Sequence, residues 1–345
     1  MFEILTCASG ADIYLAQEKN LELFVQVGYD ALDTGDGGIS GETNPVRHRE
    51  IAKKLAPAFS TRNLRAKEAA IQKHLEIFIE KIKVVGATEQ GAELQQWTDW
   101  LALDLSADMT YGLEMRQMRD SKLMKPPVAS CRAANTEAVK DSLLLSSTLK
   151  LNLFLTLSQI TRKFRILKPL MYLAIPPSVW FAMPRLIKKN TQDVETRIER
   201  RGKTEHLDYF EQLVPADKSV PTDKEEIYHV ENVAGQLLLA SWQPLANQFY
   251  SLIFFLLREP AVYAILVEEI RAAFANYDAI NMETIASLKY LQACVQESLR
   301  LHQDTVDGLP RVSPGAIVDG EYIPRGVGPP YHASYRLLLA IVTVR

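Results

Sequence analysis

The feature that most constrains the fold is an uncharged stretch from Leu237 to Leu257 with a proline, Pro244, inside it. Helix-favouring residues extend it back to about Lys224, and Pro260 stops the pattern, so we predict one helix over 224–258. At about 1.5 Å per residue this helix is roughly 50 Å long and must cross a whole domain. The uncharged run 237–257 matches a membrane span in length, but polar residues and a helix breaker disfavour insertion: Ser241, Gln243, Pro244, Asn247 and Gln248.

Helical periodicity dominates the rest of the chain. It predicts helices over 48–82 (two, separated near Pro57), 95–111 (ended by Gly112), 134–166, 192–203, 260–276 and within 282–302. We interpret 192–203 as a charged, solvated helix. Only after Leu309 do strand-like pieces occur, RVSPGAIV and EYIP, separated by the turn signal Asp319-Gly320. The sequence predicts a mainly α fold with minor β, in one domain over 1–345.

Composition excludes several classes of protein. A formal net charge of −3 disfavours a nucleic-acid binder. The three cysteines, Cys7, Cys131 and Cys294, lie too far apart for a CxxC zinc site, and nothing in their spacing indicates a disulfide framework. TGDGGISGET, residues 34–43, fits no phosphate-binding motif and is predicted to be a flexible loop. At the N-terminus we see neither a signal peptide nor a membrane anchor.

An apolar connector, KPLMYLAIPPSVWFAMPR, follows the predicted helix 134–166. The pair Pro176-Pro177 forbids a continuous helix, so the apolar residues between Met171 and Phe181 lie on a broken segment. Two interpretations stay open. The segment packs into the core between helices, or it contacts a membrane surface or a substrate entrance.

The stretch LQACVQESLRLH places Glu297 and Arg300 three residues apart, on one face of an otherwise apolar helix. GLPRVSP, a turn, DGEYIP and GVGPPYHASYR follow in that order. This order resembles the cytochrome P-450 haem-thiolate monooxygenases, in particular the membrane-associated fungal enzymes of secondary metabolism. The resemblance covers about 30–336 and implies a cytochrome P-450 fold built around the long central helix.

The resemblance also implies site residues. Glu297 and Arg300 match the structural ExxR pair, and Arg311 in LPRV matches an arginine that binds a haem propionate. ISGETNPVRHREIAKKLAPAFS resembles the segment around the haem-contacting helix. The propionate-binding aromatic residue and arginine of the family align with His48 and Ala52, and either Lys53 or Arg49 is a nearby substitute. In the central helix, Ala240, Ser241 and Trp242 align with the substrate pocket.

Two departures from the family pattern concern the chemistry. The (A/G)GxD(E)T proton relay of the family aligns with Gln243 and Pro244, neither of which cycles a proton. The FxxGxRxCxG loop, whose cysteine ligates the haem iron, is absent, and residues 337–345 resemble nothing in the family. Cys294 lies on the Glu297 helix and resembles a small core residue, so we expect no metal ligand in these 345 residues. The chain therefore looks truncated at both ends.

Two hypotheses follow. The first is a monooxygenase that oxidises a small apolar metabolite with haem, and with electrons from an NADPH-dependent reductase, but that is inactive as written, since the missing ligand argues against haem binding. The second is a non-catalytic helical relic or binding partner. The family resemblance implies the endoplasmic reticulum surface, whereas the lack of a visible anchor predicts a cytoplasmic protein if it is soluble.

Overall fold

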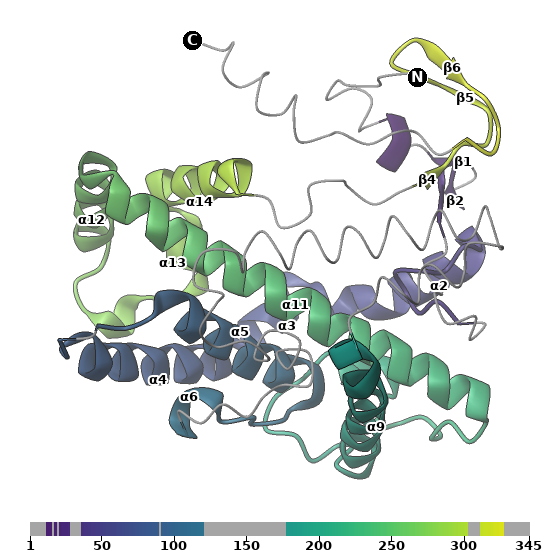
Figure 1. The fold of residues 1–345 in the computed structure, drawn as a ribbon, viewed down its shortest axis with the longest axis horizontal. Helices are drawn as coiled ribbons and strands as arrows, with labels where there is room; N and C mark the ends of the chain where they lie inside the picture. The colour runs from purple at the N-terminus through teal and green to yellow at the C-terminus, as the bar shows by residue number, and fades with distance from the viewer. Residues whose placement is uncertain are drawn as a thin grey trace.

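The computed structural model describes residues 12–15, 17–18, 21–27, 36–89, 91–120, 177–302 and 311–327, and every structural statement below concerns these residues. The helices are α2 (Pro45–Leu55), η1 (Ala56–Phe59), α3 (Thr61–Ala66), α4 (Glu68–Gly86), α5 (Leu94–Tyr111), α6 (Gln117–Asp120), α9 (Pro177–Glu199), α10 (Phe210–Leu213), α11 (Lys224–Arg258), α12 (Pro260–Ala273), η4 (Tyr277–Ala279), α13 (Met282–Ala286) and α14 (Lys289–Leu301). The fold is mainly helical with short strands, as the sequence predicts (Figure 1).

Helix α11 is the long central helix that the sequence predicts over 224–258. Asp223 occupies its N-cap position, and Pro260 opens α12 directly after its end. Figure 1 shows α11 running across the molecule, from α2 and α9 near one end to α12 and α14 at the other. Its main packing partner is α5. The helix continues without a break through Pro244.

Helix α5 is the most deeply buried helix of the described chain. Every residue from Leu101 to Tyr111 is buried, on all sides of the helix. Gly112 ends it at φ 60°, a left-handed conformation that glycine adopts without strain, and the predicted helix over 95–111 with its stop is confirmed. Asp104 accepts the backbone N–H groups of Gln117 and Met118, which fixes the start of α6. The buried carboxylate of Asp104 is thus paired with a neighbouring element, whereas the buried hydroxyls of Ser106 and Thr110 have no hydrogen-bond partner among the described residues.

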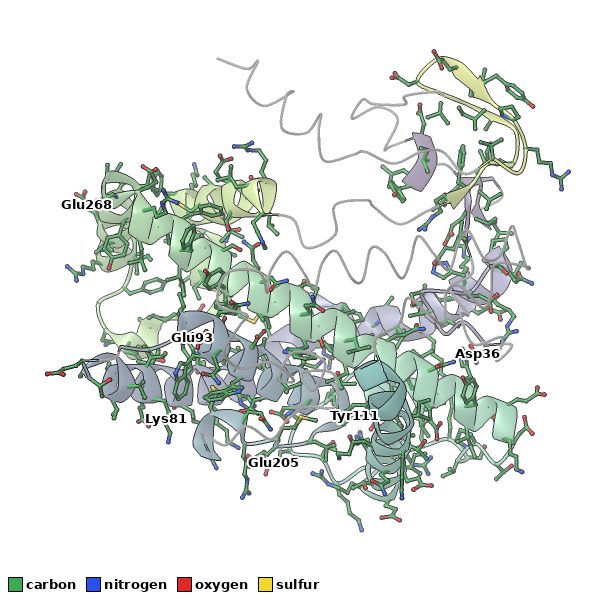
Figure 2. The ribbon with its side chains drawn as sticks, viewed as in Figure 1. Asp36, Lys81, Glu93, Tyr111, Glu205 and Glu268 are labelled. Atoms are coloured by element: carbon green, nitrogen blue, oxygen red, sulfur yellow. The ribbon has the colours of Figure 1, made fainter. Side chains whose placement is uncertain are left out.

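The largest apolar cluster lies where α2, α5, α9, α10 and α11 meet. Its members are Ile51, Leu55, Tyr111, Val194, Phe210, Leu213, Val214, Val230, Val233 and Ala234. Tyr111, labelled in Figure 2, donates its hydroxyl to the side-chain oxygen of Asn190 at 2.6 Å. A large buried ring whose hydroxyl has a partner stabilises this junction.

Helix α9 corrects two sequence predictions. Residues 192–203 were predicted to form a solvated helix, but Val194 is fully buried, and so is Arg197, which pairs with Asp208 at 2.5 Å and with Glu211 at 3.0 Å. Charge alone did not reveal this, because a buried guanidinium with two carboxylate partners looks like a surface residue in sequence. The helix also starts at Pro177, so 177–181 is helical rather than a broken connector. Residues 171–176 and the predicted helix over 134–166 lie outside the described residues.

Three two-stranded antiparallel sheets complete the fold: β1 (Gln17–Glu18) with β2 (Leu21–Glu22), β3 (Val25–Gln26) with β4 (Arg311–Val312), and β5 (Ala316–Val318) with β6 (Glu321–Ile323). The β5–β6 turn holds Asp319 at φ 50° and Gly320 at φ 81°, the two positive angles of a tight hairpin, so the turn predicted at Asp319-Gly320 is confirmed. The β3–β4 pair joins residues nearly 290 positions apart, with Val25 opposite Val312.

One further result concerns membranes. Within the described ranges, no single helix has the length and apolar composition of a membrane span. Helices α11 and α12 reach the length and apolar composition of a span only when they are taken together, and the chain bends by 111° between them.

Candidate functional site

The segment of α11 that aligns with the oxygen-activation motif presents its residues in two directions. Trp242 is 7% exposed and packs against Ala102 and Leu103 of α5, and its indole N–H donates to the carbonyl of Asp99 at 3.2 Å. Ala240 and Pro244 lie on the opposite, exposed side of the helix. Trp242 therefore packs α11 against α5, and the exposed side of α11 carries Ala240 and Pro244.

The polar groups of this segment do not form a proton relay in the described structure. The Ser241 hydroxyl donates within its own helix, to the carbonyls of Leu237 at 2.8 Å and Leu238 at 3.2 Å. Gln243 is half-buried, and its amide has no carboxylic proton to pass on. Pro244 has no backbone N–H for the carbonyl of Ala240. Proton transfer along this turn of α11 has no suitable donor among these residues.

Two of the three predicted propionate-binding residues are brought to one corner of the fold. In the β3–β4 ladder Arg311 lies directly opposite Gln26, so their side chains share a face. The Gln26 amide contacts the Nε2 atom of His48 on α2 at 2.7 Å, and the Nδ1 atom of His48 pairs with Glu22. Residues 263 positions apart therefore form one polar corner, which we call the β3–β4–α2 corner and define as Glu22, Gln26, His48 and Arg311.

The two cationic side chains of the predicted set, Arg311 and Lys53, differ in their surroundings. The Arg311 guanidinium lies 5.2 Å from the ring centre of Tyr14, within cation–π range. Lys53 is exposed on α2, five residues after His48 and therefore turned away from it by more than a quarter of the helix circumference. The structure thus brings Arg311 and His48 together and leaves Lys53 outside the β3–β4–α2 corner.

Glu297 and Arg300 form the predicted ion pair on α14. Two hydrogen bonds, of 2.7 Å and 2.5 Å, join the guanidinium to both carboxylate oxygens. The bonds from Arg300 hold the pKa of Glu297 below its usual value. The carboxylate is 51% exposed, so this pair is not a buried one and contributes little to stability.

A buried network that the sequence did not reveal is centred on Asp108 of α5. Its two oxygens accept hydrogen bonds from His74 of α4 and from His206, each at 2.9 Å. Burial acts to raise the pKa of Asp108, but the bonds from His206 and His74 outweigh it and hold that pKa well below its usual range. The bond to Asp108 raises the pKa of His206. The network ties three elements together, and nothing in the spacing of these dispersed residues indicates it.

The described residues fit a haem-thiolate only in part. The β3–β4–α2 corner offers Arg311, a cation of the kind that holds propionates. Cys294 is half-buried on α14, where burial raises the pKa of its thiol and so disfavours the thiolate that would ligate iron. The described part of the chain also holds no cluster of three or more His, Cys, Asp or Glu arranged for a metal ion. An axial thiolate is therefore not provided by these residues.

Comparison with known proteins agrees with the resemblance drawn from the motifs. The family model described as Cytochrome P450 matches residues 25–327. The chain is 41% identical over 318 residues to cytochrome P450 monooxygenase TwmD of Talaromyces wortmannii, covering 92% of this chain and 59% of that protein. It is 28% identical over 300 residues to cytochrome P450 monooxygenase btcC of Colletotrichum orbiculare, covering 86% of this chain and 53% of that protein.

The chain belongs to the cytochrome P450 family, because the family model spans most of it. The relatives that it matches are fungal monooxygenases. The chain spans between half and two thirds of the length of these curated relatives.

Proposed function

We propose that these residues form the helical block of a fungal haem-thiolate monooxygenase that oxidises a small apolar metabolite of secondary metabolism. The observation that carries the proposal is the β3–β4–α2 corner within a chain whose family match runs from 25 to 327. In this proposal Arg311 and His48 bind the haem propionates, and Lys53 assists from outside the corner. Ala240 and Ser241 border the substrate pocket, and Glu297 with Arg300 is structural. Trp242, which the sequence also predicted for the pocket, packs against α5 instead.

The 345 residues alone do not carry out the oxidation in this proposal. Haem, when held by a thiolate, supplies oxygen activation, and that thiolate favours O–O cleavage. The three cysteines of the sequence include none in an FxxGxRxCxG loop, and Gln243 with Pro244 provides no acid and no hydroxyl for proton delivery. The single domain that we predict from 1 to 345 thus contributes cofactor and substrate contacts but no axial ligand.

Partners and location follow from the family. Cytochrome P450 enzymes use a reductase and a small-molecule substrate, and an NADPH-dependent reductase is the electron source that we propose here. The family also favours the surface of the endoplasmic reticulum membrane, and the apolar segment around 171–181 is the proposed contact.

A haem titration of the purified 345-residue protein tests this proposal. Without the axial thiolate we expect haem to bind only weakly, through its propionates, and Arg311→Ala to weaken that binding about tenfold further, the size expected for one charge-assisted bond. Arg325→Ala is the control, because Arg325 is exposed beyond the β5–β6 hairpin. After reduction and addition of carbon monoxide we expect no thiolate-type Soret band. Such a band would contradict the proposed inactivity, and equal effects of the two variants would contradict the role of Arg311.

A second candidate is a non-catalytic binding partner, and exposed apolar side chains favour it. Leu257 of α11 is 68% exposed, Ile265 of α12 is 50% exposed and Leu299 of α14 is 49% exposed. Such side chains near one end of α11 form the kind of surface that another protein covers. Co-purification of one stoichiometric partner, with no haem bound after titration, would favour this candidate over the first.

A further inference from the structure

The glycine-rich segment predicted to be a flexible loop is, in its described part, docked on α11. Residues 36–41, which we call the strap, lie against the N-terminal half of α11, and Figure 2 labels Asp36 beside that helix. Asp36 pairs with the Nδ1 atom of His229 at 2.7 Å, and its carbonyl accepts a hydrogen bond from the Asn232 amide at 2.9 Å. Residues 36–41 form a loop, as predicted, and this loop is held against α11 by hydrogen bonds.

Gln236 holds the centre of the strap with both ends of its amide. Its oxygen accepts the backbone N–H groups of Ile39 at 2.9 Å and Ser40 at 3.0 Å. Its nitrogen donates to the carbonyl of Gly37 at 2.8 Å. A primary amide is the side chain that accepts and donates in this way without charge, so an alanine would lose all three bonds and a carboxylate would lose the donor.

The glycines of the strap are required by how closely it approaches α11. Gly38 has φ +59°, and a Cβ atom there would lie 2.5 Å from both amide atoms of Gln236. A Cβ atom on Gly37 would lie 2.5 Å from the backbone of Gly41. Any side chain at 38 must therefore displace either the strap or the Gln236 amide.

All of these attachments come from one face of one helix. His229, Asn232 and Gln236 are spaced three and four residues apart, which places them in a line along α11. Ile39 packs at the edge of the large apolar cluster, and the contacts of the strap with His229, Asn232 and Gln236 are hydrogen bonds. A segment fastened in this way opens at a lower free energy than the buried helices do.

We propose that residues 36–41 are a detachable strap that opens as a unit from α11 while the helical core stays folded, and that Gln236 is the positioning residue that holds it closed. Opening uncovers the polar line His229, Asn232 and Gln236. That line continues one turn further to the exposed Ala240, on the same face of the helix. The strap thus decides how much of this face of α11 is open, whether or not the protein binds haem.

Hydrogen exchange measured by mass spectrometry on the full chain tests the proposal. In the unmodified protein we expect the amides of the strap to exchange well before those of 101–111 in α5. Gln236→Ala should speed exchange in the strap about tenfold and leave α5 unchanged, because it removes the acceptor of two strap amides. Gln192→Ala, at an exposed position of α9, is the matched control and should change neither. A strap as slow as α5, or no effect of Gln236→Ala, would overturn the proposal.

A double-mutant cycle distinguishes a direct contact between Gln236 and the strap from a general loss of stability. Gly38→Ala alone should open the strap, because its new methyl group meets the Gln236 amide. In the Gln236→Ala background the same change should have a clearly smaller effect, limited to the backbone strain at φ +59°. Additive effects would show that Gln236 and Gly38 act independently and would refute the role of Gln236 as the residue that holds the strap closed. Gln236→Glu, which keeps the acceptor and loses the donor, should speed strap exchange less than Gln236→Ala.

Discussion

Helices α5 and α11 reverse the roles that their sequences suggest. The sequence of α11 contains 21 consecutive uncharged residues, from Leu237 to Leu257, whereas α5 contains Asp104, Asp108 and several hydroxyl side chains. Nevertheless α5 is buried on all sides from Leu101 to Tyr111. In α11, burial is limited to a few positions on the sides that meet its neighbours: Val230, Val233, Ala234, Trp242, Ala246, Asn247 and Ser251.

The difference shows that hydropathy alone does not decide burial in this fold. Asp104 and Asp108, the two buried aspartates of α5, each accept two hydrogen bonds from other elements. Leu257 of α11 stays exposed because the described elements do not cover that side. A polar group with a complete set of partners is stable inside a protein, and an apolar one needs only a surface to cover it.

The largest expected effect comes from the one large side chain that α11 buries against α5. Trp242→Ala removes an indole that is 7% exposed and leaves a cavity, so the free energy of unfolding should fall by about 3–5 kcal/mol. Leu239→Ala, one turn earlier and 48% exposed, should change it by less than about 1 kcal/mol. Urea unfolding measures both, and similar losses would mean that the two sides of α11 are equally buried.

The next effect comes from the polar centre of α5. Asp108→Ala leaves His74 and His206 without their acceptor, and breaking a buried pair of this kind costs about 3 kcal/mol. As a control, Glu225→Ala removes an exposed acid in the first turn of α11 and should cost about 0.5 kcal/mol. A loss below about 1 kcal/mol for Asp108→Ala would show that the network does not organise the core.

Replacing the exposed proline in the middle of α11 should stabilise the protein. Pro244→Ala restores the backbone N–H that the carbonyl of Ala240 lacks, so stability should rise by about 1–2 kcal/mol. Thermal unfolding monitored by circular dichroism gives the sign directly. A fall in stability would instead show that packing against α5 requires the local geometry that proline imposes.

The smallest expected effect is a dependence of stability on pH. The pKa of Asp108 is lowered from 3.8. Its contribution to the free energy of unfolding is therefore present above that value and is lost as pH falls through the pKa of the folded state. The pKa of His206 is raised from 6.5, so its contribution is present below that value and is lost as pH rises through the folded pKa. The stability difference between the protein and Asp108→Ala should therefore be largest between pH 3.8 and 6.5. A difference that does not vary with pH would contradict the charged network.

Much of the helical framework was predictable, because helix boundaries depend on local signals. Gly112 ends α5, Pro260 separates α11 from α12, and Asp319-Gly320 forms the hairpin turn, each by the conformational preference of its own residues. The cytochrome P450 family was equally predictable, from the order of the motifs around Glu297 and Arg311.

The rest depended on contacts between distant residues, which local signals do not contain. The burial of Arg197 required Asp208 and Glu211, and the docking of the strap required Gln236, nearly 200 positions away. The β3–β4–α2 corner adds Glu22 and Gln26 to the predicted His48 and Arg311. Strand pairing decides such a site, and the two-residue strands β3 and β4 are too short to be recognised in sequence.

One pair of substitutions tests most directly whether the core forms around α5 rather than around the apolar α11. Leu101→Ala and Leu257→Ala remove the same atoms, from a side chain that is fully buried and from one that is 68% exposed. We expect Leu101→Ala to lower the free energy of unfolding by about 2–5 kcal/mol and Leu257→Ala to change it by about 0.5 kcal/mol or less. Equal losses, or a larger loss at Leu257, would contradict a core centred on α5.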